Sequence, residues 1–175
     1  MEKKQGLVLV YTGNGKGKTT AALGLALRAI GHGAQVFMVQ FKKGNPHYGE
    51  IQAIHKYLPT FSVFQAGKNR MCEGHLDEDN VSVVQEGFEV GREALLSSKY
   101  DLCIFDEINV VMDYGLLPVT AVLKMLDDRP PHVDIVLTGR NAPQEIIERA
   151  DLISEVKEIK HHYKSGIKAR LGMEF

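Results

Sequence analysis

Short apolar runs alternate along this chain with longer segments in which apolar side chains recur at helical spacing. Such runs predict buried strands, and the helical spacing predicts helices that cover them. We expect strands at residues 6–11, 34–41, 61–65, 101–105, 133–138 and 152–159. We expect helices at residues 19–30, in a short segment ending near 57, at 81–96, between 118 and the Arg-Pro-Pro at 129–131, and from about 143. This alternation predicts an α/β fold of five or six mostly parallel strands with helices on both faces of the sheet.

The turn between the first predicted strand and the first predicted helix is rich in glycine. Glycines at 13, 15 and 17 allow several backbone N–H groups to converge on one anion, and the start of the following helix adds donors and a partial positive charge. A strand, a glycine-rich loop and a helix in this order are typical of a phosphate-binding loop, so we expect a P-loop NTPase-like (RecA-like) fold. The predicted nucleotide-binding residues are Thr12, Gly13, Asn14, Gly15, Lys16, Gly17, Lys18, Thr19 and Thr20.

This loop differs from the standard pattern in one position. The pattern G-x-x-x-x-G-K-[ST] places a glycine where this chain has Thr12. Lys18 is expected to contact the outer phosphates, Lys16 adds a second positive charge, and the Thr19 hydroxyl is placed to ligate magnesium. The alternative is a glycine-rich turn that binds no ligand.

Two adjacent carboxylates follow the fourth predicted strand. Residues 102–107 read LCIFDE, and the carboxyl end of this strand is expected at the same edge of the sheet as the phosphate-binding loop. Mg²⁺ prefers oxygen ligands, so Asp106 or Glu107 could hold it with Thr19, and the spacing leaves both open. Arg140 follows a later strand, where its guanidinium could clamp a phosphate or form a surface salt bridge.

Composition narrows the class of protein. The chain has 175 residues, 44% of them hydrophobic and 25% charged, which predicts one soluble domain over residues 1–175. A net charge of −1 gives no electrostatic reason to expect nucleic acid as a partner. We expect neither a membrane span nor a signal peptide, and Cys72 and Cys103 make no disulfide framework. These features predict a cytoplasmic protein that binds a magnesium–nucleoside triphosphate.

Several longer stretches carry a resemblance to a known family. The chain resembles the ATP:corrinoid adenosyltransferases in GNGKGKTTAALGLALRAIGHG, VQFKKG, YDLCIFDEINVVMDYGLLP, RPPHVDIVLTGRNAP and KHHYKSGIKARLGMEF. The similarity covers nearly the full length. The seven-residue GNGKGKT loop, with its missing first glycine, is itself typical of that family, as are TGR and the C-terminal ending.

The resemblance implies transfer of the 5′-deoxyadenosyl group of ATP to cobalt(I) of a reduced corrinoid, with triphosphate as the leaving group. It implies Lys18, Lys16 and Arg140 as catalytic residues, and Mg²⁺ (or Mn²⁺) held by Thr19 and by Glu107 in preference to Asp106. It also implies a homodimer and a flavoprotein reductant. Two other hypotheses are a P-loop kinase or NTPase that releases ADP or phosphate, and a non-catalytic ATP-gated corrinoid carrier.

Two features depart from the family pattern. Relatives carry an N-terminal extension over the active site, and we expect this lid to be missing or replaced here. Relatives also carry an MGEGFTW loop near the corrin, which corresponds to residues 71–77, MCEGHLD, in this chain. His75 and Asp77 therefore stand at the aromatic positions, which leaves the accepted corrinoid undetermined.

Overall fold

The structure is a computed structural model that describes residues 5–67 and 78–174. Its strands are β1 (Val8–Thr12), β2 (Val36–Phe41), β3 (Phe61–Ala66), β4 (Leu102–Asp106), β5 (Asp134–Thr138) and β6 (Leu152–Glu155). They form one sheet in the order β3-β2-β4-β5-β1-β6, in which every neighbouring pair is parallel. The predicted P-loop NTPase-like α/β fold is therefore confirmed, with six strands.

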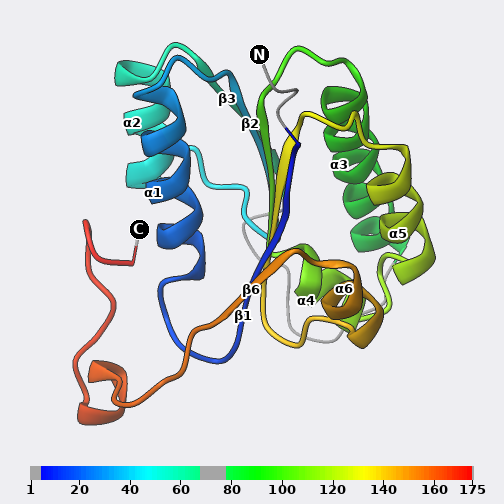
Figure 1. The fold of residues 1–175 in the computed structure, drawn as a ribbon. Coiled ribbons are helices and arrows are strands. Elements are labelled where there is room, and N and C mark those ends of the chain that lie inside the picture. Colours follow the sequence, from blue (N-terminus) through cyan, green and yellow to red (C-terminus); the bar gives the residue numbers. More distant parts are fainter. Residues whose placement is uncertain (1–4, 68–77, 175) are drawn as a thin grey trace.

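Helices cover both faces of this sheet, as the alternating pattern predicted. They are α1 (Lys18–Ile30), α2 (Gly49–Tyr57), α3 (Glu78–Leu96), α4 (Ile108–Asp113), α5 (Val119–Asp128) and α6 (Gln144–Arg149), followed by the short 3₁₀ helix η1 (His162–Ser165). Helices α1 and α2 lie on one face, and α3, α4, α5 and α6 lie on the other (Figure 1). None of the helices in the described part of the chain is long and apolar enough to cross a membrane.

The apolar core is divided by the central strands β2, β4 and β5. Successive side chains of a strand point to opposite faces, so each of these strands supplies both layers. In β4, Ile104 packs with the layer beneath α1, whereas Cys103 and Phe105 pack with the layer beneath α3 and α5. All three side chains are fully buried, which fixes the position of the two carboxylates that follow them.

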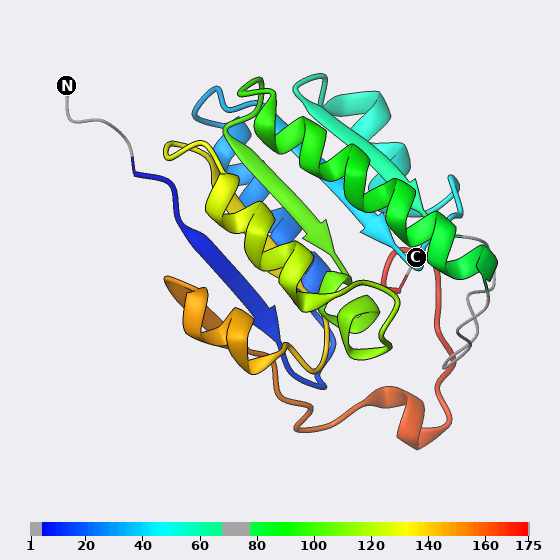
Figure 2. The same cartoon turned by 90° about the vertical axis from the view of Figure 1, so that its right-hand side faces the viewer.

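The sequence missed one helix and placed the end of one strand wrongly. Helix α4 was not predicted, because its six residues are too few to show helical periodicity. Strand β6 ends at Glu155 and not at residue 159, because only its first four residues pair with β1. The chain then leaves the sheet and returns past the carboxyl ends of the strands, where the arrowheads point in Figure 2.

Candidate active site

A cleft of about 1210 Å³ lies at the carboxyl end of the sheet. Residues 14–20, from the loop after β1 into the start of α1, line one part of it, and Glu107 and Arg140, which follow β4 and β5, line another. The C-terminal residues Met173 and Glu174 also reach the cleft. Parallel strands bring their carboxyl ends to one edge, so segments more than 100 residues apart in sequence meet here.

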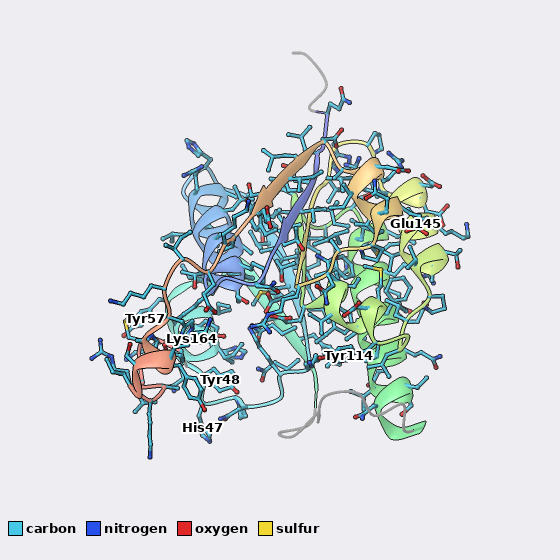
Figure 3. The ribbon with its side chains drawn as sticks, turned by 90° about the horizontal axis from the view of Figure 1, so that it is seen from below. His47, Tyr48, Tyr57, Tyr114, Glu145 and Lys164 are labelled. Carbon is cyan, nitrogen blue, oxygen red and sulfur yellow. The ribbon has the colours of Figure 1, made fainter. Side chains whose placement is uncertain are left out.

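The cleft is broad. Lys164 of η1 and Tyr114, which follows α4, both belong to its lining. The two side chains lie well apart when the molecule is seen from below (Figure 3). The space between them is larger than a phosphate group requires and suits a drug-sized or larger ligand.

The loop after β1 adopts the backbone conformation that its glycines allow. Gly13 and Gly17 have φ values of 94° and 122°, which side chains rarely tolerate. A Cβ on Gly13 would lie 2.5 Å from the carbonyl oxygen of Val156, so the loop also lies close to the chain after β6. The Gly15 N–H donates to that same Val156 oxygen at 2.7 Å. These contacts hold the loop against β6 and leave its inner side facing the cleft.

Lys18 is folded into this loop. Its Nζ donates to the carbonyl oxygens of Gly13 and Gly15, each at 2.7 Å, and the residue is only 6% exposed. Burial lowers the pKa of Lys18, although the charge of Glu107 opposes this shift. A buried ammonium whose partners are two neutral carbonyls gains more from an anion than an exposed lysine would.

Asp106 is the centre of a buried polar network. It is 0% exposed, and its two carboxylate oxygens accept four hydrogen bonds. The donors are Thr138 Oγ1 at 2.7 Å and Thr19 Oγ1 at 2.9 Å to Oδ1, and Lys43 Nζ at 2.8 Å and Gln40 Nε2 at 3.3 Å to Oδ2. Four acceptor positions are all that a carboxylate offers, so Asp106 is fully engaged.

Glu107 is placed quite differently, although it is the next residue. Its backbone has a φ of 64°, and its N–H donates to Thr138 Oγ1 at 2.9 Å. The carboxylate lines the cleft and makes no hydrogen bond with any residue in 5–67 or 78–174. Burial raises the pKa of Glu107, and the charge of Asp106 raises it further. The Glu107 carboxylate, which no described residue engages, can therefore ligate a cation.

The donor set fits a magnesium ion. Residues 5–67 and 78–174 contain no group of three or more His, Cys, Asp or Glu residues able to hold a metal. A nucleotide-bound Mg²⁺ needs less, because it is usually held by one or two carboxylates, water and the phosphates themselves. The Thr19 hydroxyl lies 2.9 Å from Asp106 and, together with Glu107, provides hard oxygen donors beside the loop.

The other predicted residues lie at the rim. Arg140 is exposed and lines the cleft. Lys16 donates to the carbonyl oxygen of Met173, and its Nζ lies 3.7 Å from a carboxylate oxygen of Glu174. Thr12, the last residue of β1, does not contribute to the lining. The predicted corrin loop at residues 71–77, which contains Cys72 and His75, lies outside the described residues.

Comparison with known proteins identifies the family. The family model described as ATP:corrinoid adenosyltransferase BtuR/CobO/CobP matches residues 4–175. This chain belongs to that family. The resemblance seen in the sequence is thus confirmed over nearly the whole length of the chain.

Individual members of the ATP:corrinoid adenosyltransferase family are also similar to this chain. The corrinoid adenosyltransferase of Escherichia coli (strain K12) is 34% identical over 174 residues, which cover 99% of this chain and 88% of that protein. The corrinoid adenosyltransferase CobA of Salmonella typhimurium (strain LT2) gives the same identity and coverage. The corrinoid adenosyltransferase of a Sinorhizobium sp is 37% identical over 174 residues, covering 98% of this chain and 81% of that protein.

Three polar residues around Asp106 were not predicted from the sequence. Gln40 and Lys43 contact Asp106, and Gln65 Nε2 donates to Gln40 Oε1 at 3.2 Å. A signal was present, because Gln40 is a polar residue within a strand that is otherwise apolar and wholly buried. Buried polar side chains are normally hydrogen-bonded, so this glutamine indicated a polar partner on a neighbouring strand.

Proposed function

We propose that this protein transfers the 5′-deoxyadenosyl group of ATP to the cobalt(I) of a reduced corrinoid and releases triphosphate. The observation that carries this proposal is the meeting of a phosphate-binding loop and Glu107 in one broad cleft, with the buried Asp106 accepting a hydrogen bond from Thr19, in a chain of the ATP:corrinoid adenosyltransferase family. The cobalt of the substrate is the nucleophile, so the reaction needs no general base from the protein. The protein has to hold the C5′ carbon in line with the cobalt and stabilise the leaving group.

The loop and its lysines would stabilise the leaving triphosphate. Backbone N–H groups of the loop, other than that of Gly15, which donates to Val156, and the start of α1 provide neutral donors. Lys18 would turn its ammonium from the Gly13 and Gly15 carbonyls to the phosphates, and Lys16 would exchange Glu174 for them. Arg140, which also lines the cleft and whose charge acts on Lys18, would contact the triphosphate as well.

We infer that Thr19 and Glu107 hold a Mg²⁺ or Mn²⁺ ion with the triphosphate. Such an ion, when bound, neutralises charge that develops on the leaving phosphates. Asp106 already accepts four hydrogen bonds and is inaccessible to solvent, which suits it to orient the Thr19 hydroxyl. Glu107 lines the cleft and makes no hydrogen bond with another described residue, which supports Glu107 as the carboxylate ligand.

The remaining expectations concern assembly and cell context. We expect a homodimer, a flavoprotein as the source of reducing electrons, and a cytoplasmic location. The edge strand β6 supports an interface with a second copy, because Leu152 and Ile153 are 43% and 44% exposed there. Exposed apolar side chains on a sheet edge are commonly covered by another chain.

Product analysis tests the proposal. The protein is mixed anaerobically with Mg²⁺, ATP and a chemically reduced corrinoid, and the visible spectrum is followed while the phosphate products are separated. We expect a light-sensitive alkyl-cobalt product and one triphosphate for each corrinoid converted, and neither in the sample without reductant. Formation of ADP or phosphate would instead identify a kinase or NTPase, and binding of both ligands without conversion would identify a carrier.

A further inference from the structure

Lys43 places a positive charge inside the network that surrounds the proposed metal site. Its Nζ lies 2.8 Å from Asp106 Oδ2 and 3.2 Å from Thr19 Oγ1. It follows β2 by two residues, and the register of the sheet sets β2 directly beside β4. The ammonium thus bridges a threonine hydroxyl and a carboxylate, which are the two kinds of oxygen that a divalent cation uses in a phosphate-binding loop.

In the ligand-free protein, the contact between Lys43 and Asp106 compensates the buried negative charge of Asp106. The Asp106 side chain is 0% exposed and that of Lys43 is 22% exposed. A buried carboxylate without a countercharge is costly, and neutral donors such as Thr138 and Gln40 compensate only part of that cost. Among the described residues, Lys43 is the cation that forms an ion pair with Asp106.

We infer that the Lys43 ammonium is a placeholder for the divalent cation when no nucleotide is bound. It would keep Thr19 and Asp106 in position, oppose the binding of a free metal ion, and give way when the metal arrives with ATP. This inference rests on the metal site proposed above. The role assigned to Lys43 is positioning, since the residue acts through Thr19 and Asp106.

The charges of Lys43, the metal ion and ATP explain why the metal would replace the Lys43 ammonium only when nucleotide binds. The Lys43 ammonium repels a free divalent ion that approaches Thr19. If the ion displaced it, the ammonium would lose its ion pair with Asp106 and gain only solvent. The triphosphate of ATP brings several negative charges to the loop, so Lys43 gains a new partner when it leaves Asp106. Metal and nucleotide would therefore bind with positive coupling, and each would strengthen the binding of the other by the same factor.

Metal titration of the nucleotide-free protein tests this inference. Mn²⁺ serves as the probe, and the electron paramagnetic resonance signal of the free ion reports how much is bound. Lys43→Met keeps the length of the side chain but removes its charge, and Lys43→Gln removes the charge while keeping an N–H donor for Asp106. We expect either variant to bind Mn²⁺ at least ~10-fold more tightly than the wild type, because one repelling charge within a few ångströms is lost.

Lys56→Met provides the matched control. Lys56 carries the same charge and is exposed, its ammonium lies over the Tyr57 ring at 5.0 Å from the ring centre, and it does not line the cleft. Its replacement should change Mn²⁺ affinity by no more than about twofold, since solvent and salt screen a more distant charge. If the control variant raises Mn²⁺ affinity as much as Lys43→Met does, the cause is the change in net charge and the placeholder role is wrong.

The remaining outcomes are also decisive. Mn²⁺ affinity in both Lys43 variants equal to that of the wild type would refute the placeholder and leave the metal site standing. Failure of every form to bind Mn²⁺, with or without ATP, would refute the metal site itself. If the Lys43 variants fold only when Mn²⁺ is present, the metal replaces the ammonium as inferred, and if they fold in neither condition the inference is wrong.

Discussion

Thr138→Val should separate the contribution of the polar network from that of the apolar core. Thr138 is 0% exposed at the end of β5, so its β-branched shape is already accommodated and valine fits the same space. The hydroxyl donates to Asp106 Oδ1 at 2.7 Å and accepts from the Glu107 N–H at 2.9 Å. The substitution therefore removes two hydrogen bonds and creates no cavity.

The expected cost follows from these two bonds. A hydrogen bond to a charged group contributes about 1.5–3 kcal/mol, and a buried N–H without a partner costs about 1–3 kcal/mol. Because the two losses share one hydroxyl and partial relaxation is expected, we expect Thr138→Val to lower the free energy of unfolding by about 2–5 kcal/mol. For a chain of this length each kcal/mol lowers the melting temperature by about 2–4 °C.

Urea unfolding of the nucleotide-free protein near pH 7 measures this cost, and Thr60→Val is the control. The Thr60 hydroxyl has a buried oxygen that finds no hydrogen-bond partner among the described residues. Its replacement should change the free energy of unfolding by less than about 0.5 kcal/mol, or raise it slightly. If Thr138→Val is as stable as Thr60→Val, the network around Asp106 does not stabilise the fold and the reasoning above fails.

Further substitutions probe the cleft and the residues behind it. Lys18→Ala should abolish productive ATP binding, measured by calorimetry, and near-normal turnover would contradict the role of the loop. Burial and the charge of Asp106 raise the pKa of Glu107, so ionisation of this carboxyl group in the folded state lowers the free energy of unfolding. Glu107→Gln should therefore be more stable than the wild type at neutral pH. This gain in stability should disappear as the pH falls through the raised pKa toward 4.5. Glu107→Gln should lose more metal-dependent activity than Asp106→Asn. The reverse order would identify Asp106 as the metal ligand in place of Glu107. Glu174→Gln should tighten ATP binding by about 2–5-fold, because its carboxylate competes with the triphosphate for Lys16, whereas weaker binding would show that the tail completes the ATP site.

The phosphate-binding loop could be predicted from sequence because its determinants are local. The glycines, Lys18 and Thr19 lie within seven consecutive residues, and a strand and a helix on either side fix their direction. The carboxylates after β4 could be predicted for a related reason, since the ends of parallel strands meet at one edge without any knowledge of strand order. The family resemblance then added the reaction, which the loop alone leaves open.

Lys43 could not be selected in the same way. The sequence presents two adjacent lysines after β2, and nothing local distinguishes them. The structure separates them through the backbone, because Lys42 has a φ of 62° and directs its ammonium toward Tyr114, while Lys43 reaches Asp106. That reach also requires β2 to lie next to β4, a neighbour relation that only the strand order supplies.

The contacts of the C-terminal segment could not be anticipated from the sequence. After η1 it returns to the phosphate-binding loop, where Glu174 lies 3.7 Å from Lys16 and 3.1 Å from the Nε2 of His162. Lys16 lies far from Glu174 in sequence, and charged residues near a chain end usually remain in solvent. No periodic pattern marks such a contact, because a single carboxylate carries it.

Asp106 and Glu107 show how one backbone turn assigns two roles to adjacent, chemically similar residues. The strand ends at Asp106, whose side chain lies among Thr19, Thr138 and Lys43 and has no solvent exposure. The left-handed conformation at Glu107 then turns the chain into α4, and the Thr138 hydroxyl fixes that turn by accepting its N–H. The same hydroxyl thus holds the buried carboxylate in the network and the next carboxylate at the cleft. Sequence spacing cannot distinguish the two carboxylates, because their roles depend on β5, whose Thr138 side chain contacts both residues.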